Sequence, residues 1–220
     1  MATYVITGAN RGIGLELCRQ LKARGDEIIA LCRHTSPALQ ALDLLVEEGI
    51  DVADDGVVAV LRERLAGRAI DVVVNNAGVL TRESLDDLDF DRMRRQFEIN
   101  SLGPLRVTAG LLDNLSAGAK IVIITSRMGS IGDNTSGSRY GYRMSKAAVN
   151  IAGVSLARDL ADRKIAVAIL HPGFVRTDMT GHQGLCDPPE SAAGLIARMD
   201  ELSLATSGTF WHMNGEQLPW

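Results

Sequence analysis

The sequence lacks the features that mark secreted, disulfide-rich or membrane-spanning proteins. It has only three cysteines, Cys18, Cys32 and Cys186, an odd number without C-x-x-C spacing, so neither a disulfide framework nor a structural zinc site is expected. No apolar run reaches the roughly 18 residues that a membrane span needs. The opening segment, MATYVITGAN, also lacks the basic region and long apolar stretch of a signal peptide. We therefore expect a cytoplasmic protein with reduced cysteines and no metal site.

An excess of positive charge is also missing. Lysine and arginine number 23 against 27 aspartates and glutamates, and the formal net charge of −4 gives no electrostatic reason to bind nucleic acid or an anionic membrane surface. Hydrophobic residues make up 46% of the chain and charged residues 23%, which are ordinary values for a globular protein. By length alone, 220 residues suffice for one full-sized core and allow one domain or two.

What the chain does contain is a regular alternation of short apolar runs and helical spacing. The apolar runs, which predict strands, cover residues 2–7, 27–31, 49–52, 70–74, 120–125 and 165–170. Helical spacing covers residues 15–24, 37–48, 54–65, 90–115, 147–160 and 191–201, and residues 209–211 suggest an additional edge strand. Strands that alternate with helices form right-handed βαβ units. We therefore predict an α/β Rossmann fold, a doubly wound parallel sheet in three α/β/α layers, with residues 1–220 as a single domain.

The first predicted strand ends in a glycine-rich turn, TGANRGIG at residues 7–14, and a helical pattern follows it directly. The spacing G-x-x-x-G-x-G differs from the common G-x-G-x-x-G, but the physical purposes are the same. Gly8 permits a tight turn, Gly12 lets the backbone approach a pyrophosphate, and Gly14 lets helix and strand pack closely. The free N–H groups of the helix N-terminus attract phosphate. The cofactor-binding candidates of this turn are Gly8, Asn10, Arg11, Gly12, Ile13 and Gly14.

The residues after the second strand indicate which dinucleotide binds. NAD-binding sheets usually carry an acid here to take the ribose hydroxyls, whereas Cys32-Arg33-His34 contains none. Arg33, helped by Arg11, suits the 2′-phosphate of NADP(H), so NADP(H) is expected and NAD(H) is less favoured, although each arginine also fits an ordinary surface position. Asp51, with Val52 beside it, can present a carboxylate to the adenine amino group, cap the helix at residues 54–65, or do both.

A second cluster of candidates follows the apolar run at residues 70–74. It consists of Asn75-Asn76-Ala77-Gly78, which are small residues and amides at the carboxyl end of a central strand. Ligands of open α/β sheets lie at this edge. We assign Asn75 to scaffolding between neighbouring loops, and Asn76, Ala77 and Gly78 to the cofactor site.

Two further polar residues stand at interruptions of apolar segments. Asn100 precedes Gly103-Pro104, a pair that should kink the helix at residues 90–115. At that kink Asn100 either holds a water near the site or satisfies the backbone at the break. Ser126 follows the strand at residues 120–125, where a hydroxyl can donate a hydrogen bond to a substrate oxygen.

Tyr142 and Lys146 are four residues apart, so on a helix they lie on one face. An ammonium beside a phenol favours the phenolate, which should lower the pKa of Tyr142 from about 10 toward the range of a general acid–base. Tyr140 does not qualify, because it would lie on another face and precedes the expected helix start. His171, a lone histidine before Pro-Gly, is assigned a structural role. An isolated Tyr-x-x-x-Lys pair is weak evidence, so the surrounding motifs decide its meaning.

In their order along nearly the whole chain, these motifs resemble the short-chain dehydrogenase/reductase family. The matching segments are TGANRGIG at 7–14, NNAG at 75–78, Asn100, Ser126, Tyr142 with Lys146, and HPGFVRTDM at 171–179. Residues 126–146, SRMGSIGDNTSGSRYGYRMSK, are most similar to the small carbonyl-reductase-like members of the sniffer and C-factor type. The chain is shorter than the usual member around the third strand and the substrate loop, and its loop from Ser126 to Tyr142 is longer. Both departures should reshape the substrate pocket.

The resemblance implies an NADP(H)-dependent carbonyl reductase or alcohol dehydrogenase with the catalytic residues Asn100, Ser126, Tyr142 and Lys146. Tyr142 would donate a proton to the carbonyl oxygen, and Ser126 would hydrogen-bond that oxygen. Lys146 would lower the pKa of Tyr142 and hold the nicotinamide ribose, while Asn100 would seat a water of a proton relay. The resemblance also implies that the nicotinamide carboxamide is held by the segment containing Pro172, Gly173, Val175 and Thr177.

Two other functions compete with this one: a dinucleotide-sensing regulatory or signalling protein with little turnover, and a scaffold for assembly. A sensor would not need all four catalytic residues, and the complete phosphate loop argues against a scaffold. The helices at residues 90–115 and 147–160 carry more apolar surface than one sheet face needs, so a homodimer or homotetramer is expected. Apart from the class of small carbonyl compounds and alcohols, the sequence does not determine the substrate.

Overall fold

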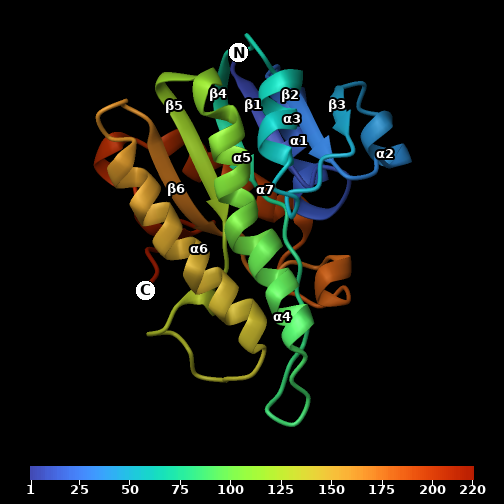
Figure 1. The fold of residues 1–220 in the computed structure, drawn as a ribbon, viewed down its shortest axis with the longest axis vertical. Coiled ribbons are helices and arrows are strands. Elements are labelled where there is room, and N and C mark those ends of the chain that lie inside the picture. The colour runs from blue at the N-terminus through green and yellow to red at the C-terminus, as the bar shows by residue number, and fades with distance from the viewer.

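The computed structural model describes all residues from 1 to 220 and contains one seven-stranded sheet (Figure 1). The strands are β1 (Thr3–Thr7), β2 (Glu27–Cys32), β3 (Leu45–Glu48), β4 (Ile70–Asn75), β5 (Leu115–Ile124), β6 (Ala166–His171) and β7 (Phe210–His212). They lie in the order β3-β2-β1-β4-β5-β6-β7, and every neighbouring pair is parallel. The strand order reverses between β1 and β4, where such sheets form a crevice at the carboxyl ends of their strands. The predicted doubly wound α/β fold is confirmed.

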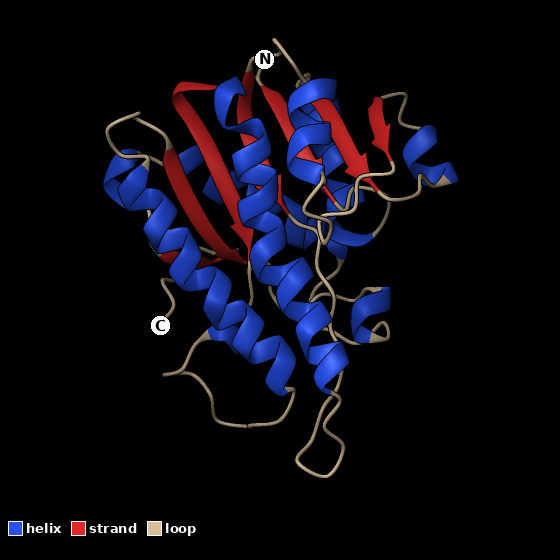
Figure 2. Ribbon diagram, in the orientation of Figure 1, coloured by secondary structure: helices blue, strands red, loops and turns tan.

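Helices cover both faces of the sheet (Figure 2). Their bounds are α1 (Gly12–Arg24), α2 (Pro37–Gln40), α3 (Val57–Arg64), α4 (Phe90–Phe97), α5 (Gly103–Leu111), α6 (Tyr140–Asp159) and α7 (Pro188–Glu201). On one face α5 packs against α3, and α6 packs against α4, while α1 and α7 pack together on the opposite face. None of these helices is both long and apolar enough to cross a membrane.

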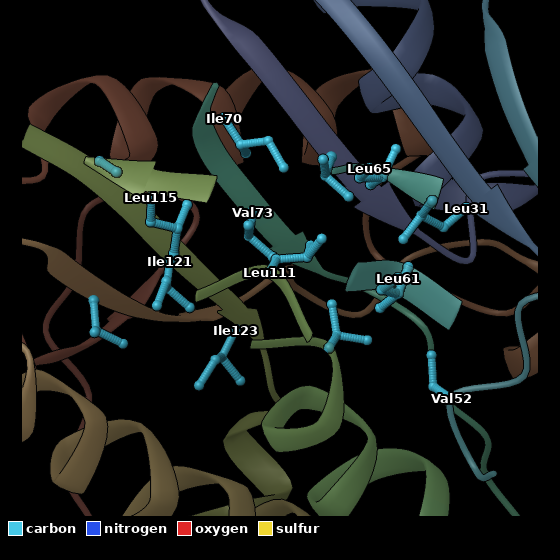
Figure 3. Packing of buried hydrophobic residues seen from close by; sticks show 14 of the residues in the cluster. Leu31, Val52, Leu61, Leu65, Ile70, Val73, Leu111, Leu115, Ile121 and Ile123 are labelled. Atoms are coloured by element: carbon cyan, nitrogen blue, oxygen red, sulfur yellow. The ribbon is translucent and has the colours of Figure 1, made fainter. Parts of the chain in front are cut away.

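The core consists of two hydrophobic layers, one on each side of the sheet. Side chains of successive strand residues point to opposite faces, so Val73 contributes to the layer under α3 and α5, and Val74 contributes to the layer under α1 and α7. Figure 3 shows Val73 and Ile121 among Leu61 and Leu111 in the first layer. Each such fully buried side chain stabilises the fold by about 1.5–3 kcal/mol. Because both faces are filled, a ligand can reach the sheet only at its edges.

The structure corrects the predicted elements between residues 37 and 52. The helix predicted for residues 37–48 ends at Gln40, and residues 45–48 form β3 instead of the strand predicted at residues 49–52. Ser36 caps the short helix by accepting a hydrogen bond from Leu39 N at 3.1 Å. Beyond it, pairing with the open edge of β2 outweighs a weak helical spacing. The strand then stops before Gly49, whose φ is +81°.

The long helix predicted for residues 90–115 is also divided. A π-helical turn, Glu98–Leu102, separates α4 from α5, and β5 already begins at Leu115 instead of at residue 120. A π turn inserts an extra residue and is often found at functional sites. The predicted disturbance therefore exists, although it precedes the Gly103-Pro104 pair that suggested it. Pro104, which has no N–H to donate, directly follows this π turn in a helical backbone that continues into α5.

Three predicted helix starts shift by a few residues. The helix predicted from residue 54 begins at Val57, and the last helix begins at Pro188 instead of residue 191. Helix α6 begins at Tyr140, so the prediction that Tyr140 precedes this helix is wrong. Its preceding residue, Arg139, is left-handed with φ +51°, which turns the chain into the helix. The one-face relation of Tyr142 and Lys146 is unaffected by this shift.

Candidate active site

A cavity of about 430 Å³ lies at the carboxyl ends of the central strands. Most of the residues proposed from the sequence line it together: Gly8, Asn10, Arg11, Gly12, Ile13, Arg33, Asp51, Val52, Asn76, Ala77, Gly78, Tyr142, Lys146, Pro172 and Thr177. It is also lined by residues that sequence reasoning did not select: Thr7, Leu31, Cys32, His34, Ile50, Val79, Arg95, Ile99, Ile124, Thr125, Asp178 and Met179. Among the proposed residues, Gly14, Asn100, Ser126, Gly173 and Val175 lie outside this lining.

The glycine turn after β1 has the strained backbone that its glycines allow. Gly8 and Gly12 have φ values of +65° and +55°. A side chain on Gly14 would overlap the carbonyl oxygen of Gly8 and the amide of Asn76. That amide nitrogen donates hydrogen bonds to Thr7 O at 2.9 Å and Gly8 O at 3.3 Å. The close packing of Gly14 and the hydrogen bonds of Asn76 therefore fix the conformation of this turn, which we expect to bind a phosphate.

Asn75 and Asn76 exchange the roles expected from the sequence. The amide that joins neighbouring loops belongs to Asn76, while both polar atoms of the Asn75 side chain are buried without a hydrogen-bond partner. Asn76 thus both stabilises the glycine turn and lines the cavity. Adjacent residues of a strand point to opposite faces, so a one-residue difference decides which amide reaches β1.

The end of the cavity near β2 carries both signs of charge. Arg33 and His34 line it, and the Arg33 guanidinium forms no ion pair. Glu48, at the end of β3, accepts a hydrogen bond from Thr35 N at 3.1 Å and lies 3.9 Å from His34 Nδ1. The sequence did not indicate this acid, because only the pairing of Cys32 with Glu48 across β2 and β3 brings it to the site.

Two residues expected at the adenosine end have different contacts. The Asp51 carboxylate accepts a hydrogen bond from Ala53 N at 3.0 Å, and α3 begins only at Val57, so the capping role suggested for Asp51 is wrong. Asp51 remains on the cavity wall, open to an adenine. Arg11 points across the phosphate turn to Asp178, with Nη1 and Oδ2 3.5 Å apart, instead of toward Arg33.

Tyr142 and Lys146 lie in the buried first turns of α6, with 8% and 5% of their surfaces exposed. The Lys146 ammonium is 5.8 Å from the centre of the Tyr142 ring and donates a hydrogen bond to Ile124 O at 2.9 Å. Ser126 is also buried, and its hydroxyl is close enough to the Tyr142 phenol to influence the pKa of that phenol. The structure thus brings the phenol, the ammonium and the hydroxyl together at one end of the cavity.

Burial dominates the protonation of this pair. Desolvation raises the pKa of Tyr142 to about 12, opposed only by the neighbouring Ser126 hydroxyl. Desolvation also lowers the pKa of Lys146 to about 8, so near pH 8 only a part of the Lys146 side chains carries a proton and a positive charge. The lowering of the Tyr142 pKa by Lys146 that the sequence predicted is therefore absent here. Desolvation of the phenol outweighs the attraction of a distant and weakened ammonium.

The Asn100 side chain is fully occupied by hydrogen bonds. Its Oδ1 accepts from Val79 N at 2.8 Å, and its Nδ2 donates to Val79 O at 2.9 Å and to Ser145 Oγ at 3.0 Å. It therefore ties the loop after β4 to α6 from within the π turn. Of the two roles left open by the sequence, this is closer to the second, in which Asn100 hydrogen-bonds backbone groups. The backbone groups it bonds belong to Val79 in the loop after β4 and not to the helix break itself.

The segment after β6 places Thr177 against the phosphate turn, and Thr177 contacts the space where Gly12 lacks a side chain. Val175 is buried and pairs with Cys186, so the segment folds back on itself, and the Val175 carbonyl oxygen accepts a hydrogen bond from Thr180 Oγ1 at 2.8 Å. His171 is buried at the end of β6, 5.0 Å from the His212 ring, and its Nδ1 has no partner. These contacts agree with the structural role expected of His171.

The geometry describes an elongated site with a defined polarity. One end carries the arginine and histidine after β2, the middle is the glycine turn at a helix N-terminus, and the other end carries a buried proton donor. Such a site fits a dinucleotide, whose pyrophosphate lies over the helix N-terminus, and a reacting group beside the Tyr142 phenol.

Comparison with known proteins agrees with this geometry. The pattern of the short chain dehydrogenase family matches residues 2–185. A 1-hydroxy-2-glutathionyl-2-methyl-3-butene dehydrogenase of a Rhodococcus species is 43% identical over the full length of both chains, and the C-signal protein of Myxococcus xanthus is 44% identical over 69% of this chain and 93% of its own. An NADPH-bound carbonyl reductase from chicken fatty liver superposes with a TM-score of 0.88 at 29% identity, covering 100% of this chain and 99% of that one. The chain therefore belongs to the short-chain dehydrogenase family.

Proposed function

We propose that this protein is an NADP(H)-dependent oxidoreductase that interconverts a carbonyl compound and an alcohol. The observation that carries the proposal is the buried cluster of Tyr142, Lys146 and Ser126 at one end of a dinucleotide-shaped cavity. NADP(H) is supported by the free Arg33 at the other end and by the NADPH bound to the similar carbonyl reductase.

The residues present fit this cofactor. The glycine turn has no room for a side chain at Gly14, and Gly12 leaves the helix N-terminus open to a phosphate. Asp51 offers an acceptor for the adenine amino group, and Thr177, which also lines the cavity, would hold the carboxamide together with the main chain near Val175. The nicotinamide, when bound, supplies or accepts the hydride.

The chain's own residues handle the proton. Tyr142, with a pKa of about 12, is protonated throughout the physiological range, as a proton donor to a carbonyl oxygen must be. The Ser126 hydroxyl, which neighbours the Tyr142 phenol, would orient the same oxygen. Lys146 holds the nicotinamide ribose, and Asn100 fixes the loop that carries Gly78. In the oxidation of an alcohol these transfers are reversed. Tyr142 first releases its phenolic proton to solvent and then accepts the hydroxyl proton of the alcohol.

A second candidate is a dinucleotide-sensing signalling protein with little turnover, and the similarity to C-signal favours it. A sensor needs the phosphate turn and the adenosine end, but it does not need a proton donor buried beside a lysine. The presence of Tyr142, Lys146 and Ser126 in one cluster supports the enzyme.

We also propose that the protein is cytoplasmic, since its three cysteines are all unpaired.

We also propose that the chain forms a homodimer or homotetramer. Large apolar side chains are exposed on the outer face of the π turn and of α6, namely Leu102, Met144 and Ile151, of which Ile151 is 65% exposed. Apolar side chains gathered on neighbouring helices favour association with another copy.

The proposed activity is tested with a panel of aldehydes and ketones, using NADPH and NADH and following the absorbance of the reduced nicotinamide. We expect turnover with NADPH, and we expect Tyr142→Phe to reduce kcat by about 10²–10⁴-fold because a positioned proton donor is lost. Cofactor binding by the variant, measured by calorimetry, should remain. Tyr140→Phe is the matched control. Wild-type binding of NADPH without turnover of any carbonyl would favour the sensor.

A further inference from the structure

Most cationic side chains of this protein have an anionic or carbonyl partner. Most arginines form ion pairs or donate hydrogen bonds to carbonyl oxygens, as Arg106 does with Glu98 and Asp55. The cationic side chains with neither kind of partner are Arg33, Arg82, Arg95, Arg139, Arg158 and Lys164. Arg33 belongs to the adenosine end of the cavity, Arg158 lies in the last turn of α6, and Lys164 follows that helix. The remaining three cations have no structural partner and are not used by the mechanism.

These three arginines come from segments that meet at the lower edge of Figure 1. Arg82 lies in the loop before α4, Arg95 lies on α4, and Arg139 immediately precedes α6. The segments are joined by hydrogen bonds. Arg139 N donates to Glu83 O at 2.8 Å, and the Gln96 side chain accepts from Thr81 N and donates to Glu83 Oε1, each at 3.1 Å.

This edge also contains the reactive end of the cavity. Arg95 lines the same cavity as Tyr142 and Lys146, and Arg139 stands one helical turn before Tyr142. The Arg143 guanidinium donates hydrogen bonds to Gly137 O and Ser138 O, which brings a further positive charge to the entrance. Burial, and then the neighbouring Arg139, lower the pKa of Arg143, while Asp133 raises it.

Acidic groups near this entrance do not neutralise the three arginines. The Glu83 carboxylate is buried, with 3% exposed, and its hydrogen bonds go to Thr81 and Gln96. Asp89 caps α4, and Asp91 pairs with Arg94. The nearest uncommitted acids, Asp86 and Asp87, are exposed in the loop beyond Arg82. A cationic side chain that lines a cavity without a counter-ion, as Arg95 does, favours an anionic group on the ligand.

We infer that the substrate carries a carboxylate, which Arg95 binds with Arg82 and Arg139 while the reacting carbon lies at the Tyr142 phenol. This inference rests on the proposed function and specifies its substrate class. A guanidinium binds a carboxylate by paired, charge-assisted hydrogen bonds, so each such contact changes affinity by about tenfold or more. Arg95 is the specificity-determining residue, because it is the one of the three that lines the cavity itself.

The test compares 4-carboxybenzaldehyde, which carries a carboxylate, with its neutral methyl ester, with saturating NADPH. We expect the wild-type kcat/KM to favour the acid by about tenfold or more. Arg95→Gln should reduce this acid-to-ester ratio by about tenfold, mainly through KM, and added salt should also reduce it. Arg158→Gln, which removes an equally unpaired arginine at the far end of α6, should keep the wild-type ratio.

Equal kcat/KM for acid and ester in the wild type would overturn the inference. So would an Arg95→Gln variant that keeps the ratio and instead raises the KM for NADPH, because Arg95 would then serve the cofactor. If no aldehyde or ketone is turned over, the proposed function fails, and calorimetry of 4-carboxybenzaldehyde binding decides the inference by itself. Binding of the acid must then exceed that of the ester by about tenfold, and Arg95→Gln must remove the difference.

Discussion

His171 should make the stability of this protein sensitive to mild acid. Its side chain is 9% exposed at the end of β6, and its Nδ1 has no hydrogen-bond partner. Burial, followed by the nearby charges of His212, Arg127 and Lys146, lowers the pKa of His171 to about 3, against an ordinary value of 6.5. The folded protein therefore keeps this imidazole neutral at pH values where the unfolded chain binds a proton.

The sign and size of the effect follow from that difference. Between about pH 6.5 and pH 3 the unfolded state binds the proton more tightly, so acid shifts the equilibrium toward unfolding and stability falls as the pH falls. For these two pKa values, the loss of unfolding free energy between pH 7 and pH 5 is about 2 kcal/mol. In urea this corresponds to a fall in the unfolding midpoint of about 1 M.

The assay is urea unfolding of the wild type and of His171→Phe at pH 7, 6 and 5. The variant keeps an aromatic ring beside His212 but cannot bind a proton, so its loss of stability between pH 7 and pH 5 should be smaller by about 2 kcal/mol. His182→Gln, which removes an exposed imidazole, serves as the control. The reasoning is refuted if His171→Phe and the wild type lose the same stability over this range, whatever their stabilities at pH 7.

Two further predictions concern the cofactor and the assembly. We expect the wild type to prefer NADPH over NADH by about tenfold to a few hundredfold in kcat/KM, and Arg33→Gln to remove most of this preference while leaving kcat/KM with NADH nearly unchanged. Arg11→Gln should have a smaller effect, because Arg11 faces Asp178. Equal wild-type kcat/KM values for the two cofactors would show that the role assigned to Arg33 is wrong. Light scattering at micromolar concentration should show a dimer or tetramer, and Ile151→Asp, which charges the exposed face of α6, should dissociate it; a fully active wild-type monomer would contradict this.

The amino-acid sequence by itself determined the fold and the local chemistry of the site. Buried strands such as β4 and β6 are continuous apolar runs, because both faces of the sheet are covered. The phosphate turn follows from the local backbone needs of Gly8, Gly12 and Gly14, and the pairing of Tyr142 with Lys146 follows from helical periodicity. In each of these cases the interacting residues lie within a few positions of one another along the chain.

Only the tertiary structure decided the features that depend on distant segments or on burial. β3 forms at residues 45–48 because the edge of β2 accepts it, and this pairing brings Glu48 to the adenosine end. The pKa of Tyr142 rises because the whole site is desolvated, a property that a pair of residues on an isolated helix does not have. Buried Gln96 joins α4 to the loop that carries Arg82, and Glu83 O joins that loop to Arg139, so these segments come together only in the fold. Hydrogen bonds and desolvation between such distant segments arise only once the chain has folded, so no local pattern of residues encodes them.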